Sequence, residues 1–231
     1  GHDTVFHLAA LVNVRESVRN PKATMDVNLG GTSSLLEACR FNDVNRFVFA
    51  STIAVYGRPV WVPYDEKHPT QPISPYGVSK LAGEHLVRVY GELYGLKMVS
   101  LRFSNIYGTG GAGVISVFLR NIQRGEPITV YGGEQTEDFI HVNPAVDAYE
   151  LCLSPKAEGV YNIGSGEFIS ISGLVDLIRG VLADPFEVRF EPVKAGEISS
   201  YSVDCRKAKL GLGWMPYVSL EDGVRLSLIH I

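Results

Sequence analysis

Apolar and polar positions along the chain follow two different periods. Short apolar runs rich in strand-forming residues occupy positions 4–10, 45–51 and 97–103. Longer segments with apolar residues on one helical side run between them, from Pro21 to about Phe41 and from Pro75 to Tyr94. Short buried strands separated by helices are typical of βαβ units with a parallel sheet. The pattern therefore predicts an α/β fold.

Local signals mark the ends of these helices. Asn20 and Ser74 each precede a proline, which places a capping residue before a proline at the first helical position. Gly95 follows the second helix where a glycine in the left-handed conformation commonly ends one. We expect these helices to end close to the positions that the pattern indicates.

The pattern of long helices and strands changes after Gly108, since three of the four residues at 108–111 are glycine. Shorter elements follow this glycine-rich segment. Earlier in the chain, residues 53–73 contain prolines and charges and are predicted to form a long loop. A capping-box pattern at Ser219 and Asp222 marks the start of the last helix. The elements expected in this half are helices at 114–124, 143–153, 173–183 and 219–229, and strands at 128–131, 138–142, 160–163 and 187–190.

Composition narrows the functional classes. The chain has 231 residues, of which 45% are hydrophobic and 20% charged, with a net charge of −4. These values exclude a disordered tail, and no basic run favours a nucleic-acid partner. No apolar stretch is long enough to span a membrane. The three cysteines fit neither a zinc site nor a disulfide framework, so we expect a reducing, cytoplasmic location.

The strongest local motif is Tyr76-Gly-Val-Ser-Lys80. Residues four apart on a helix face the same way, so the Lys80 ammonium can lie near the Tyr76 hydroxyl. A nearby cation favours the phenolate, and tyrosine is a poor base at neutral pH without such help. An exposed pair on a helix surface would give the same pattern, so other positions must support a catalytic interpretation.

Four polar residues add that support. Ser51 and Thr52 end one apolar strand, and Asn105 follows another, where the carboxyl edge of a parallel sheet meets ligands. Each could instead be a turn residue. Asn28 lies inside a helix, where asparagine is a poor former, and either a buried polar contact or a surface position would explain it.

Other kinds of site have no such support. His7 and His141 lie in apolar strands and are expected to be core histidines with hydrogen-bond partners. No group of His, Cys, Asp and Glu has metal-ligand spacing, and no G-x-S-x-G motif indicates a hydrolase. We therefore expect no metal site.

Several motifs in order resemble the extended short-chain dehydrogenase/reductase family of NAD-dependent epimerases and dehydratases, in particular nucleotide-sugar epimerases of the UDP-glucose 4-epimerase type. The matching stretches are FHLAA (6–10), NLGGTSSLLEACR (28–40), RFVFASTIAVYG (46–57), SPYGVSKLAGE (74–84), LRFSNIYGTG (101–110), DFIHV (138–142), GVYNIGSG (159–166) and GEISSYSVD (196–204). The resemblance implies an incomplete Rossmann-like, doubly wound parallel sheet with a smaller C-terminal α+β substrate lobe. It assigns 1–108 and 143–168 to the NAD-binding part, and 109–142 and 169–231 to the lobe.

The resemblance also implies site residues and NAD as cofactor. The catalytic set is Thr52, Tyr76 and Lys80. The positions lining NAD are Ala9, Ala10, Asn28, Ser51, Tyr76, Lys80 and Phe103. The positions near a nucleotide-sugar substrate are Thr52, Asn105, Val114, Tyr131, Lys194 and Tyr201. The implied reaction is a transient oxidation at sugar C4: Tyr76 removes the hydroxyl proton, and a hydride passes to NAD and returns to the other face.

The chain departs from the family pattern at several places. Glu137 and Lys194 stand where the family has arginines that grip the substrate diphosphate, and lysine lacks the bidentate fork. Ile53 and Ala54 replace the acidic pair of related dehydratases, which favours an epimerase or a simple oxidoreductase. The apolar ending at 228–231 also differs from the family's more polar final helix.

The family's glycine-rich phosphate loop is not found in the sequence, which begins at what would be the fourth strand. The 231 residues alone are therefore expected to bind NAD weakly. A non-catalytic fragment or scaffold that keeps the fold, or a related oxidoreductase, is the alternative to an epimerase. The family also implies a homodimer through the helices that carry Leu35 and Tyr76.

Overall fold

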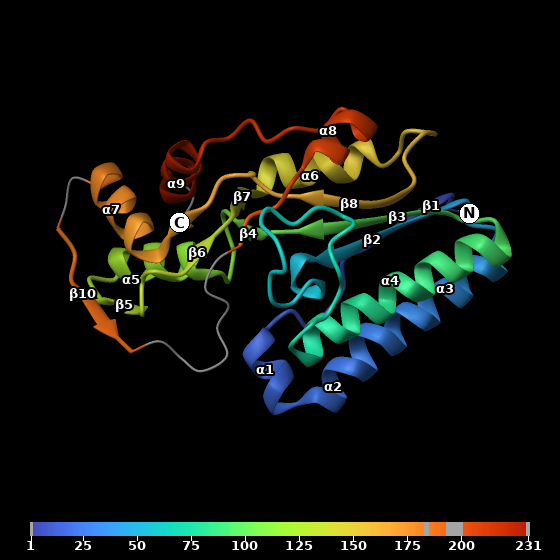
Figure 1. Cartoon of the computed structure of the whole chain (residues 1–231), viewed down its shortest axis with the longest axis horizontal. Helices are drawn as coiled ribbons and strands as arrows, with labels where there is room; N and C mark the ends of the chain where they lie inside the picture. The colour runs from blue at the N-terminus through green and yellow to red at the C-terminus, as the bar shows by residue number, and fades with distance from the viewer. Residues whose placement is uncertain (1, 183–184, 193–200, 230–231) are drawn as a thin grey trace.

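A four-stranded parallel sheet forms the centre of the larger part of the molecule (Figure 1). The computed structural model describes residues 2–182, 185–192 and 201–229. The sheet order is β1-β2-β3-β8, and every neighbouring pair is parallel. Its strands are β1 (Thr4–His7), β2 (Arg46–Thr52), β3 (Lys97–Phe103) and β8 (Gly159–Ile163). The parallel sheet predicted from the apolar runs is confirmed.

Helices cover both faces of this sheet (Figure 1). One face packs on α3 (Gly31–Phe41) and α4 (Pro75–Tyr94), and the other on α6 (Val142–Leu151) and α8 (Arg206–Leu212). Phe47 and Phe49 point to the first face, while Val48 points to the second. Alternate residues of β2 thus enter two different cores, as the two-residue period of a strand requires.

A smaller lobe lies beside the carboxyl ends of the strands, with its own apolar core (Figure 1). Its helices are α5 (Val114–Gln123), α7 (Ile171–Val181) and α9 (Leu220–Ile229), and its strands are β5 (Ile128–Tyr131) and β10 (Val188–Glu191), which pair in parallel. Two small pairs connect the lobe with the main sheet: β4 (Asn105–Tyr107) with β7 (Phe139–His141), and β6 (Thr136–Glu137) with β9 (Ile169–Ser170).

Most predicted helix ends agree with the structure. Ser74 Oγ accepts from the Gly77 amide at the start of α4, and Gly95 ends the helix in the left-handed conformation. At α9, the Asp222 amide donates to Ser219 Oγ, as the capping pattern predicted. The start of α6 differs, because His141 rather than Asn143 is the capping residue and its Nδ1 accepts from the Asn143 amide.

The helix predicted from Pro21 to Phe41 is interrupted. It consists of α2 (Pro21–Met25), a π-helical turn (Asp26–Gly30) and α3. Extra turns of this kind are frequent at functional sites. Asn28 lies in the turn, and its buried amide is engaged outside the helix. Asn28 therefore makes buried polar contacts rather than occupying a surface position.

Two of the described α-helices were not predicted, and neither were the short strands β4, β6 and β9. The short helix α1 (Val14–Arg19) packs on α2 and α4, and α8 packs on the main sheet. The expected division of the chain placed 169–231 wholly in the lobe. That division is wrong for α8, because Ala208, Leu212 and the following Trp214 enter the apolar core of β3 and β8.

Candidate active site

Two catalytic candidates, Thr52 and Tyr76, meet where β2 ends and α4 begins. Thr52 is the last residue of β2, and Tyr76 lies in the first turn of α4. The Thr52 hydroxyl hydrogen-bonds with the Tyr76 hydroxyl and also accepts from the Ala54 amide, at 3.2 Å. Gly77 permits this close approach, because a Cβ there would lie 2.6 Å from the Ala54 carbonyl oxygen.

Lys80 lies one turn further along α4, with its side chain buried. Its Nζ donates to the Ala50 carbonyl at 2.8 Å and lies 4.9 Å from the centroid of the Phe49 ring. Burial lowers the pKa of Lys80 to about 8. An ammonium has three donors, and the Ala50 carbonyl takes one of them.

The effect of these surroundings on Tyr76 differs from the sequence-based expectation. Burial raises the pKa of Tyr76, and the hydrogen bond from Thr52 only partly opposes that rise. Lys80 does not act on the phenol here, because its ammonium is directed to the Ala50 carbonyl. Tyr76 and Lys80 therefore lie on the same side of α4, but the Lys80 ammonium does not bond to the Tyr76 hydroxyl.

Asn28 ties three elements together beside this pair. Its side chain accepts from the Leu11 amide at 2.7 Å and donates to the Leu11 carbonyl at 3.0 Å. It also donates to the hydroxyl of Ser79 on α4, at 3.0 Å. These bonds fix the segment after β1, where Ala9 and Ala10 follow the strand without being buried.

Ser51 and Phe103 lie at the same sheet edge but point into packed surroundings. The Ser51 hydroxyl donates to the carboxylate of Glu84 on α4. The Phe103 ring is buried, 5.3 Å from the ring of Tyr149. The resemblance listed both residues among those lining NAD. Their side chains are engaged with protein groups in this structure.

The residues present fit the nicotinamide side of a dinucleotide. Lys80 has donors left for ribose hydroxyls, and the small side chains of Ala9 and Ala10 leave the end of β1 open. Parallel sheets of this kind bind ligands outside the carboxyl ends of their strands, which is where Thr52 and Tyr76 lie. The donor set therefore suits NAD.

On the substrate side, the structure brings Asn105 and Tyr201 together. The Asn105 Nδ2 donates to the Tyr201 hydroxyl at 2.5 Å and to Glu137 Oε2 at 3.1 Å. Burial raises the pKa of Tyr201 well above its ordinary value, and the negative charge of Glu137 adds to that rise. The Glu137 carboxylate thus accepts a hydrogen bond from Asn105 at a position where the family resemblance implies an arginine.

Other predicted substrate residues lie on the lobe. Val114 starts α5 and Tyr131 ends β5. The Arg15 guanidinium, from α1 of the larger part, lies 5.9 Å from the centroid of the Tyr131 ring. Arg15 and Tyr131 therefore make one contact between the two parts of the molecule. Lys194 lies outside the described residues.

The buried ion pair of Glu84 with Arg102 was missed by the sequence analysis. Arg102 Nε and Nη2 donate to the two carboxylate oxygens at 2.9 and 2.6 Å. A signal was present, because arginine within the apolar strand MVSLRF needs a buried partner. Glu84 also lies four residues after Lys80, and so on the same side of the helix.

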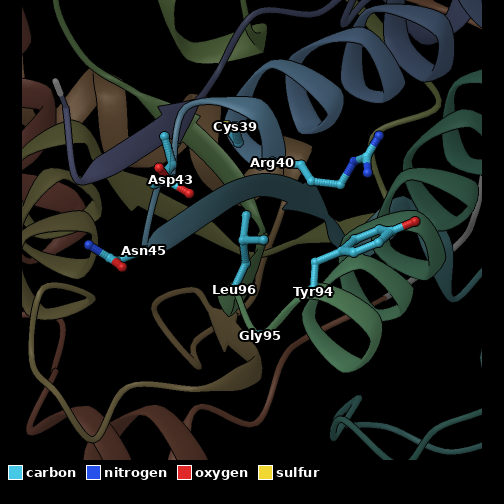
Figure 2. Close-up of a pocket in the computed structure, with 8 residues that line it drawn as sticks. Cys39, Arg40, Asp43, Asn45, Tyr94, Gly95 and Leu96 are labelled. Atoms are coloured by element: carbon cyan, nitrogen blue, oxygen red, sulfur yellow. The ribbon is translucent and has the colours of Figure 1, made fainter.

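Two hollows lined by described residues both lie away from Thr52, Tyr76 and Lys80. A groove of about 430 Å³ passes Glu137 and Ser165 in the lobe. A smaller hollow of about 160 Å³, lined by Arg40, Tyr94 and neighbours, lies at the opposite sheet edge, where β2 and β3 begin (Figure 2). The smaller hollow therefore takes no part in the candidate site.

The two histidines of the apolar strands, His7 and His141, are both buried. His7 is buried, with Nε2 2.9 Å from the Thr32 hydroxyl, and is a core histidine as predicted. His141 is also buried and caps α6. Among the described residues, no group of three His, Cys, Asp or Glu side chains is arranged to hold a metal ion.

Comparisons with known proteins agree with this geometry. Residues 2–227 match the family model described as GDP-mannose 4,6 dehydratase. The UDP-glucose 4-epimerase of Mycolicibacterium smegmatis is 34% identical, with 96% of this chain and 74% of that protein covered. Among solved structures, the Thermotoga maritima UDP-glucose 4-epimerase with UDP-glucose has a TM-score of 0.95 at 36% identity, covering 99% of this chain and 76% of that one. The Thermus thermophilus UDP-glucose 4-epimerase complexed with NAD has a TM-score of 0.92 at 35% identity, covering 99% and 77%.

Proposed function

Because the chain belongs to the NAD-dependent epimerase and dehydratase family, whose matching model is described as GDP-mannose 4,6 dehydratase, we propose that it is a nucleotide-sugar 4-epimerase interconverting UDP-glucose and UDP-galactose. The observation that carries this proposal is the hydrogen bond between Thr52 and Tyr76 beside the buried Lys80. Together these residues supply a proton acceptor, a relay and a cation at one sheet edge.

The proposed chemistry starts with a proton. Tyr76 acts as its phenolate, which the hydrogen bond from the Thr52 hydroxyl stabilises before the transfer. The phenolate oxygen takes the proton from the sugar 4-hydroxyl and becomes a phenol. NAD bound here would accept the hydride from sugar C4 and return it to the opposite face. Lys80 would hold the nicotinamide ribose and, once its ammonium turns from the Ala50 carbonyl, would also stabilise the phenolate. Tyr76 finally returns its proton to the sugar.

The nucleotide sugar is proposed to bind on the side of the site that faces the smaller lobe. Asn105 and Tyr201 are proposed to contact the hexose, since they already share a hydrogen bond at the end of β3. Val114, Tyr131 and Lys194 are proposed to face the nucleotide and its diphosphate. Ala9, Ala10 and Asn28 are proposed to line NAD, and Ser51 and Phe103 to shape that side through their packing.

Residues after Thr52 favour epimerisation over dehydration. Loss of water from a 4-keto sugar needs a proton donor and an acceptor near the sugar. Ile53 and Ala54 follow Thr52, and neither side chain transfers protons. The sugar would therefore keep its 6-hydroxyl and leave only with its C4 configuration changed.

The test is product analysis with the NAD-loaded protein that carries this chain. UDP-galactose is supplied, and NMR follows the appearance of UDP-glucose while absorbance at 340 nm follows NADH. Epimerisation gives UDP-glucose without net NADH. Net NADH would instead identify an oxidoreductase, a 4-keto-6-deoxy product a dehydratase, and no product at all would contradict the proposal.

A cytoplasmic homodimer is proposed from surface and cysteine evidence. Phe41 and Leu93, at the ends of α3 and α4, leave 72% and 67% of their surface exposed, which suits a helix-to-helix interface. The free cysteines fit a reducing compartment. No described helix has the length and apolar character needed to cross a membrane. Light scattering should give twice the protomer mass, and the Leu93→Glu variant should have the mass of a single protomer.

A further inference from the structure

One side of α4 makes a regular series of contacts with the end of β2. Tyr76, Lys80 and Glu84 are spaced four apart and therefore share that side. Tyr76 bonds with the Thr52 hydroxyl, Lys80 with the Ala50 carbonyl, and Glu84 with the Ser51 hydroxyl. Three consecutive residues of β2 are thus each held by a different residue of the helix.

Glu84 is also held by a residue of the neighbouring strand β3. Its carboxylate is gripped at both oxygens by Arg102, and both side chains are buried. Arg102 lies on β3 directly beside Ser51 of β2 in the sheet register. One carboxylate therefore joins the catalytic helix to two neighbouring strands.

The guanidinium extends the connection away from the helix. Arg102 Nη1 donates to the Tyr56 hydroxyl at 3.0 Å, and this hydroxyl donates to Asn162 Oδ1 at 2.6 Å. The Asn162 side chain then donates to the Tyr64 carbonyl at 3.0 Å. Arg102 is therefore held from its far side as well, so Glu84 rests against an anchored partner.

From this arrangement we infer that Glu84 is a positioning residue for the proposed reaction: through the Ser51 hydroxyl it sets β2 against α4, and so places Tyr76 and Lys80. Glu84 itself does not touch the substrate, since its carboxylate is buried and both oxygens have protein partners. The inference rests on the proposed function for its kinetic part. A purely structural pair would stabilise the fold without affecting the turnover of folded protein.

The informative variant is Ser51→Ala. Replacing Glu84 would leave the Arg102 guanidinium buried without its partner, and such a variant can fail to fold. Ser51→Ala removes one hydroxyl and keeps the ion pair. We expect kcat to fall about tenfold, because small displacements of catalytic groups are costly. The KM for UDP-galactose, the Kd for NAD and the Tm should stay close to the wild-type values.

Two further variants make the comparison specific. Ser227→Ala removes another buried hydroxyl, which donates to the Gly223 carbonyl of its own helix in the lobe, and should leave kcat unchanged. Ser51→Thr keeps a hydroxyl on a residue that suits strands and should recover most of kcat. A wild-type kcat in Ser51→Ala, or a raised Kd for NAD with kcat retained, would overturn the inference.

A second measurement does not depend on turnover. In Ser51→Ala, looser packing admits water to Lys80, so NMR of labelled lysine should show its titration midpoint moving up by about half a pH unit or more. An unchanged midpoint would contradict the positioning role. If the wild-type protein does not act on UDP-galactose, the proposed function fails, while the lysine titration still decides whether Glu84 positions α4.

Discussion

The catalytic side and the substrate side of the candidate site are built differently. Thr52 and Tyr76 lie on a seven-residue strand and a twenty-residue helix that pack directly on each other. Asn105 and Glu137 lie on strands of three and two residues. The first pair is positioned by long regular elements, and the second by individual hydrogen bonds between short segments.

Asp138 shows how the substrate side is held. Its buried carboxylate accepts from the Ser104 hydroxyl, from the amide and hydroxyl of Ser165, and from the Gly166 amide, at 2.7 to 3.0 Å. Burial raises the pKa of Asp138, and these hydrogen bonds oppose the rise. The comparison teaches that the proposed catalytic pair is tied to the core of the molecule, while the proposed substrate side is held by local contacts.

The largest expected effect tests the catalytic side. Tyr76→Phe removes the proton acceptor but keeps the ring, so turnover should fall by about 10²–10⁴-fold, the usual contribution of general acid–base catalysis. NAD binding should be nearly unchanged. Steady-state kinetics and calorimetry with NAD measure the two effects. Near-normal turnover would remove Tyr76 from the mechanism.

Lys80→Ala should lower turnover by about 10²-fold, because it removes a preorganised charge from a buried site. Unlike Tyr76→Phe, it should also weaken NAD binding, since the ammonium is proposed to hold the ribose. Calorimetry with NAD distinguishes the two variants. Normal NAD affinity in Lys80→Ala would show that the proposed double role is wrong.

Glu137→Arg sharpens the comparison from the substrate side. It changes the local charge by two units and adds a fork that matches phosphate oxygens, so UDP-galactose binding should tighten by about tenfold. Turnover of bound substrate should change little. Glu137→Gln is the matched control, since it removes the charge without adding the fork, and should tighten binding less. Calorimetry showing equal or weaker affinity for Glu137→Arg would place the diphosphate elsewhere.

The smallest expected effect is a dependence on pH. Burial lowers the pKa of Lys80 to about 8, so its charged form is lost as the pH rises through that value. Turnover should be about half its plateau near pH 8 and continue to fall above it. Unfolding does not explain such a fall, because a lysine pKa lowered by folding adds stability as pH rises from about 8 toward 10.5. A flat profile between pH 7 and 9 would contradict this role.

Local periodicity in the sequence was enough to determine the main elements and the central motif. The strand predicted at 97–103 and the helix from Pro75 to Tyr94 occur with those bounds. The spacing of Tyr76 and Lys80 placed both on one side of α4. These features depend on residues a few positions apart, whose geometry a regular backbone dictates. The role of each residue came from the family resemblance.

Only the tertiary structure decided which distant groups meet and how they titrate. Asn105 and Tyr201 are 96 positions apart, and Glu84 and Arg102 lie on different elements 18 positions apart. The addition of α8 to the main sheet is of the same kind. The opposite pKa shifts of Tyr76 and Lys80 arise from burial, which depends on every segment packed around them. Sequence spacing does not encode these surroundings, because desolvation and long-range hydrogen bonds exist only once the chain has folded.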